Sequence, residues 1–100
     1  MGERQVRRRL EDLQRRLAAA RESQHVLEEQ VLVWNDALED ARIRSLVSET
    51  PLQTQEYDEL SRHVAAANAE LVRRAHEVRN LKAERDALLH EWTPKDEPER

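Results

Sequence analysis

Residues 48–53 read Ser-Glu-Thr-Pro-Leu-Gln, and this stretch divides the chain of 100 residues into two halves. Proline has no backbone N–H and disfavours helical geometry at the residue before it, so a helix that reaches this stretch must end before Thr50. Thr50, Pro51 and Gln53 together form a helix start signal, with Thr50 as the N-cap and Pro51 at the first helical position. The sequence therefore predicts a turn at about 48–50 with a helix on each side.

On the N-terminal side of the turn, apolar residues recur at the spacing of a coiled coil. Alternating steps of four and three residues from Val6 reach a series of positions that are apolar except at Gln24 and Ser45. This repeat of about 3.5 residues is the heptad pattern, whose buried a and d positions form the contact seam between helices. It predicts helix one over about 3–47, with these seam residues: Val6, Leu10, Leu13, Leu17, Ala20, Gln24, Leu27, Val31, Trp34, Leu38, Ala41 and Ser45.

The same spacing continues beyond the turn and predicts helix two over about 51–92. Only Arg74 and Arg85 interrupt its apolar seam, which runs through Tyr57, Leu60, Val64, Ala67, Leu71, Val78, Leu81, Leu88 and Trp92. Thr93-Pro94 ends the helix, and residues 93–100 are expected to form a polar, flexible tail. The domain prediction is therefore one helical hairpin, 1–92, followed by this tail.

A turn this short forces two long helices back on themselves as an antiparallel pair. The register that fills the seam best sets Trp34 against Ala67 and Val31 against Leu71. It also places Arg9 near Glu91 and Arg16 near Glu84 on the flanks, and it lets Arg74 reach Glu28. The fold class is thus all-α, a long two-helix coiled coil, and a rod about 60 Å long follows from the helical rise.

Composition limits the other classes of fold and function. Charged residues make up 38% of the chain, with one Gly, no Phe and no Cys, which is typical of long helices and excludes disulfides and zinc–thiolate sites. The first residues are too charged for a signal peptide, and no apolar run approaches the roughly 18 residues of a membrane span. We expect a cytoplasmic protein without membrane contact, and the Arg- and Ala-rich style is typical of a GC-rich bacterium or its phage.

A second set of apolar residues lies off the seam, where a lone hairpin would leave it in water. Exposed apolar clusters commonly mark interfaces, although scattered surface Val and Ala remain the simpler alternative. Because two helices alone bury little surface, we expect a homodimer that forms a four-helix bundle. The predicted partner-binding residues are Val26, Val33, Ile43, Leu46, Val47, Ala65, Ala69 and Val72.

Charge is unevenly distributed along a chain whose net charge is −4, with acidic residues near the turn and basic residues near the open end. The basic group is a possible anion-binding surface, with an ordinary solvated face as the alternative. An acidic-tipped helical hairpin is also similar, at the level of fold, to the arm of bacterial factors that enter the RNA polymerase secondary channel. The possible anion-binding residues are Arg7, Arg8, Arg9, Arg21, Lys82 and Arg85.

The sequence offers no catalytic, cofactor-binding or metal-binding motif. Glu22 and His25 have the Glu-x-x-His spacing of di-iron bundles, but both lie off the seam and helix two has no matching set. We therefore predict a non-enzymatic protein–protein interaction module: an adaptor, scaffold or regulatory subunit with a protein partner of unknown identity. The alternative is a transcription or nucleic-acid-associated factor that uses the acidic tip or the basic open end.

Overall fold

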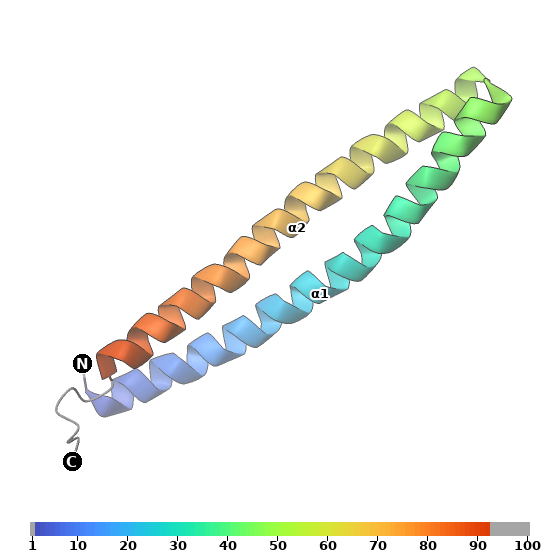
Figure 1. Cartoon of the computed structure of the whole chain (residues 1–100). Helices are drawn as coiled ribbons and strands as arrows, with labels where there is room; N and C mark the ends of the chain where they lie inside the picture. The colour runs from blue at the N-terminus through green and yellow to red at the C-terminus, as the bar shows by residue number, and fades with distance from the viewer. Residues whose placement is uncertain (1, 93–100) are drawn as a thin grey trace, which may run out of the picture.

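A computed structural model describes residues 2–92 and shows two long antiparallel helices (Figure 1). Helix α1 spans Glu3–Ser48 and helix α2 spans Pro51–Trp92, so the described part of the chain is almost entirely helical. The hairpin is extended, 67 Å long, and both of its free ends lie opposite the turn. The predicted helical hairpin is confirmed. The predicted tail, 93–100, lies outside the described residues.

The connection between the helices consists of Glu49 and Thr50, one residue fewer than predicted. Helix α1 ends because Glu49 adopts left-handed geometry, with φ 51° and ψ 33°, while its N–H donates to the Ser45 carbonyl at 3.1 Å. Thr50 then caps α2, since the Gln53 N–H donates to the Thr50 hydroxyl oxygen at 3.2 Å. The cap satisfies one of the free N–H groups in the first turn of α2.

The backbone at Glu49 provides a test of this turn. Left-handed geometry destabilises the folded state by roughly 1–2 kcal/mol when the residue has a Cβ atom. Glycine avoids this steric cost but loses more conformational entropy on folding. We expect Glu49→Gly to raise the free energy of unfolding by roughly 0.5–1 kcal/mol in urea titrations. Glu49→Ala removes the same side chain but keeps the Cβ atom, so it should not be stabilising. Equal effects of the two variants would contradict the assigned geometry.

The core is a narrow strip in which buried residues follow the predicted seam. Two clusters hold most of it, one near the open end and one in the middle of the hairpin. The first is Val6, Leu13, Leu17, Leu81 and Leu88, with Leu10, Ala20 and Val78 packed against it. The second is Leu27, Val31 and Ala67, with Trp34 and Leu71 packed against it. Nearer the turn, Ala41 and Val64 are also buried.

The two clusters group the residues that the predicted register opposes, and Trp34 also contacts a residue beside the seam. The ring of Trp34 meets the ring of His63 edge-on, with centroids 4.5 Å apart, whereas the prediction opposed Trp34 to Ala67. Trp34 nevertheless packs against the cluster that contains Ala67. The difference has a physical reason, because a coiled-coil side chain enters a hole between several residues of the other helix. Trp92, predicted on the seam, is 44% exposed.

Ion pairs form within helices, which corrects the predicted cross-helix pairs. Arg74 Nε lies 3.1 Å from Glu70 Oε2, and Arg74 Nη1 donates to the Ser23 carbonyl at 3.1 Å, so its predicted pairing with Glu28 is wrong. Arg16 pairs with an acid one turn earlier on its own helix instead of Glu84. Residues three or four apart on a helix are already neighbours, and pairing them requires no particular helix–helix register.

Candidate interaction surfaces

Apolar side chains are exposed along the whole hairpin. Within residues 2–92 the large exposed apolar side chains are as numerous as the buried core residues. A surface of this kind is unusual for a free-standing fold, since exposed apolar area is favourable to cover. The exposed residues are Val26, Leu32, Val33, Ile43, Leu46, Val47, Leu52, Val72, Leu89 and Trp92.

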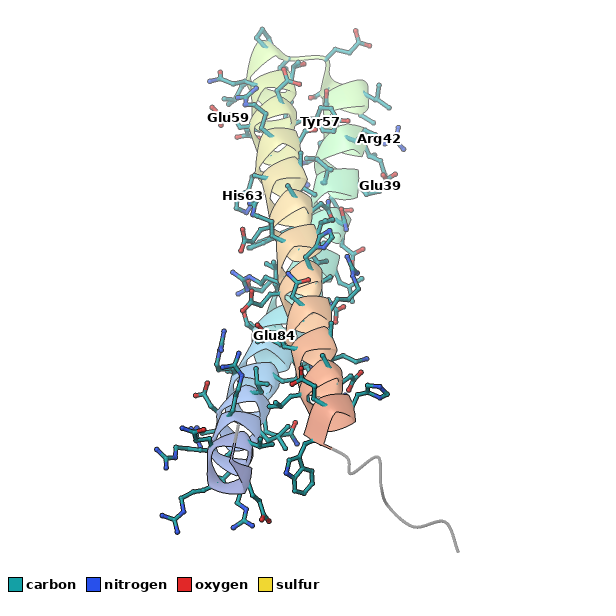
Figure 2. All side chains as sticks on the ribbon, turned by 90° about the vertical axis from the view of Figure 1, so that its left-hand side faces the viewer. Glu39, Arg42, Tyr57, Glu59, His63 and Glu84 are labelled. Atoms are coloured by element: carbon teal, nitrogen blue, oxygen red, sulfur yellow. The ribbon has the colours of Figure 1, made fainter. Side chains whose placement is uncertain are left out.

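The heptad pattern divides this surface into two opposite faces. Residues that directly follow a seam residue lie on one face of the hairpin, which we call the neutral face. Residues that directly precede a seam residue lie on the other, the acidic face. Figure 2 shows the division, with Glu39 and Arg42 on one side of the hairpin and Glu59 and His63 on the other.

The predicted partner-binding residues do not form a single surface. Val26 and Val33 line a shallow hollow beside Trp34 on the acidic face. Ile43 and Val47 line a second hollow near the turn, together with Gln53 of α2. All of these residues except Gln53 belong to α1.

The remaining predicted residues lie elsewhere. Leu46, Ala65 and Val72 each follow a seam residue and therefore lie on the neutral face, as does Leu32. All of these residues are exposed. Ala69 is also exposed, and it lies on the outer side of α2, between the two faces and opposite the seam. Their exposure agrees with the prediction, whereas their division between two faces was not predicted. A partner that covers one face leaves the other free.

The acidic face carries a row of glutamates that sequence reasoning missed. At successive heptads of α2, the residue before the seam is acidic at every step except His63: Glu56, His63, Glu70, Glu77, Glu84 and Glu91. Glu56, Glu77 and Glu84 have no ion-pair partner among residues 2–92. The sevenfold spacing of these glutamates in the sequence is the signal that indicates this row. The acidic character therefore extends along a face and is not restricted to the tip.

Two carboxylates are held in charged form by arginines of their own helix. Hydrogen bonds from Arg42, the shorter at 2.7 Å, lower the pKa of Glu39, and the positive charge of Arg42 adds to the effect. Hydrogen bonds from Arg73 and Arg74 lower the pKa of Glu70 in the same way. Glu39 is exposed and Glu70 is partly exposed, so water screens these pairs and their contribution to stability is small.

The predicted anion-binding residues spread around the open end. Arg7, Arg8 and Arg9 are consecutive on α1 and therefore point in different directions, each about 100° from the next. Arg8 and Arg9 line a shallow hollow with Gln5, Asp12 and Arg15. Acidic residues interleave with this basic group, so it does not form a continuous basic patch.

Two members of the basic group form ion pairs with acidic residues of their own helix, and two others are exposed on the neutral face. Arg7 lies 3.4 Å from Glu3, and Arg85, whose side chain is 24% exposed, lies 3.1 Å from Asp86. Arg21 and Lys82 are exposed on the neutral face and have no ion-pair partner among the described residues. These two remain available for an external contact.

The described residues hold no group of three or more metal-ligating side chains. His25, predicted to be a coincidental match to a di-iron motif, lies 3.3 Å from Glu29 and 3.9 Å from Glu28. Within residues 2–92, no helix has the length and apolar character needed to cross a membrane. Comparison of the chain with protein-family models, curated proteins and solved structures finds no match.

Proposed function

We propose that the chain is a non-enzymatic coiled-coil module that acts by binding protein surfaces and that it associates with itself. The observation that carries the proposal is the set of large apolar side chains left exposed beside a narrow core. Solvent-facing positions of a free hairpin should be polar, whereas these positions carry large apolar side chains. An adaptor, scaffold or regulatory role would use such a surface.

Free energy supports association over a free hairpin. Burying a large aliphatic side chain contributes roughly 1.5–3 kcal/mol, so covering a few of them approaches the total stability of a small domain. Association also has a cost in lost translational and rotational freedom, and only the remainder appears as affinity. A dimer covers the same residues on both chains at once, which doubles the gain for a single association.

Sedimentation equilibrium tests the proposal directly. We expect the wild-type chain to be a dimer at micromolar concentration, and Ile43→Asp combined with Leu46→Asp to give a monomer or a partly unfolded chain. The added carboxylates cannot be buried without a large desolvation penalty. Gln30→Asp combined with Gln55→Asp adds the same charge at polar exposed positions and should leave the dimer intact. A wild-type chain that stays folded and monomeric at high concentration would refute self-association.

A further inference from the structure

We propose that a second copy of the chain packs antiparallel on the neutral face, with the two-fold axis beside Leu32 and Asn68. This inference rests on the proposed function, which it deepens by assigning the face and the direction of packing. In this arrangement each helix meets the same helix of the second copy, running the other way. The result is a four-helix bundle whose acidic tips lie toward the partner's basic open end.

The apolar residues of the neutral face fit this arrangement. At the axis, Leu32 meets Leu32 of the second copy, and at equal distances from it Ala18 meets Leu46. On α2 the paired residues are centred between Asn68 and Ala69, which brings Ala65 against Val72. Small residues thus face larger ones, which lets two helices approach at the close distance of a packed core. Every one of these side chains is exposed in the single hairpin.

The charges of the neutral face fit the same register. Asp58, which has no ion-pair partner among residues 2–92, comes to lie near Arg79 of the second copy. Glu39 comes to lie near His25. Symmetry makes each of these contacts occur twice. One like-charge approach results, between Arg42 and Arg21, but Arg42 remains bonded to Glu39 at 2.7 Å, which offsets its charge.

The acidic face is a poor alternative for a second copy. Antiparallel stacking of that face on itself would oppose the glutamate row of α2 to the same row of the second copy, and like charges in contact destabilise an interface. A parallel arrangement on the neutral face is also disfavoured. It would bring the basic residues Arg21, Arg79 and Lys82 of one chain beside the same residues of the other. Charge therefore favours the neutral face among antiparallel arrangements, and the antiparallel direction on the neutral face.

Cysteine cross-linking tests the arrangement, because the chain has no cysteine of its own. Leu32→Cys and Val33→Cys change adjacent residues of nearly equal exposure, 67% and 65%, on opposite faces. A disulfide requires Cα atoms about 4.4–6.8 Å apart, which only a residue at the two-fold axis satisfies. In a glutathione redox buffer we expect Leu32→Cys to form the intermolecular disulfide roughly tenfold faster than Val33→Cys, because the axis gives a high effective concentration.

The outcomes separate this inference from the proposed function. If the wild-type chain is a dimer by sedimentation but Val33→Cys cross-links as fast as Leu32→Cys, or neither does, the assigned arrangement is wrong and self-association stands. If the wild-type chain is a monomer, self-association itself fails. Faster cross-linking of Leu32→Cys in a dimeric protein supports both.

A charge reversal gives a second, independent readout on the same dimer. Asp58→Arg places like charges at two symmetric positions and should weaken dimerisation about tenfold at low salt. Combining it with Arg79→Asp reverses the pair and should restore most of the affinity. Glu56→Arg, on the acidic face, should leave the affinity nearly unchanged. A double variant as weak as Asp58→Arg alone would overturn the pairing of Asp58 with Arg79.

Discussion

Replacing Leu17 by alanine is expected to lower the free energy of unfolding by about 2–5 kcal/mol. Leu17 is 1% exposed, the most completely buried large side chain among the described residues, and it lies in the open-end cluster with Leu81 and Leu88. Its removal loses the burial of the side chain and leaves a cavity that two long, rigid helices cannot easily collapse to fill. Urea denaturation followed by circular dichroism measures the change, at one fixed protein concentration because association shifts apparent stability.

The matched control is Leu52→Ala, which makes the same chemical change at an exposed position of α2. It should alter the free energy of unfolding by no more than about 0.5 kcal/mol. Similar losses for the two variants would show that the open-end cluster is not the main core of the hairpin.

Replacing Ala67 by tryptophan is expected to destabilise the hairpin by roughly 1–3 kcal/mol through overpacking. Ala67 is 9% exposed and lies in the middle cluster with Leu27 and Val31, where the indole ring of Trp34 already fills the adjoining space. A second indole can enter only if the helices move apart. A fall in the thermal unfolding midpoint at fixed protein concentration would show this effect.

The neighbouring residue gives the control for this substitution. Ala66 is exposed on the acidic face, so Ala66→Trp adds the same ring without forcing it into the seam. It should leave the unfolding midpoint almost unchanged. Should Ala66→Trp prove the more disruptive of the two, the assignment of seam and outer positions on α2 would be wrong.

The helices and the turn could be predicted because each depends on local sequence. Heptad spacing marks the seam, and the Thr50-Pro51 pair marks the start of α2, whatever the rest of the chain does. The predicted helix limits differ by no more than one residue from Glu3–Ser48 and Pro51–Trp92. Most seam residues are buried or half-buried, including the polar Gln24.

The parts that sequence reasoning missed depend on small differences in position between helices. Arg74 had two acids within reach on paper, and it pairs with Glu70 because that residue lies one turn away on the same helix. The edge contact between Trp34 and His63 was not predicted, because heptad counting pairs seam positions and His63 lies beside the seam. The division of Val33 and Leu46 between opposite faces follows from their heptad positions, since Val33 precedes a seam residue and Leu46 follows one.

The position of the main core has a consequence for how the hairpin is held closed. Leu13, Leu17 and Leu88 lie at the end farthest from the connection, so the contact that secures the helices also closes the longest loop. Chain entropy makes this inexpensive, because each doubling of loop length costs only about 0.6 kcal/mol. The two helices are therefore joined covalently by the turn at one end and held together by the buried open-end cluster at the other. Helix ends that would ordinarily fray are held together by the open-end cluster.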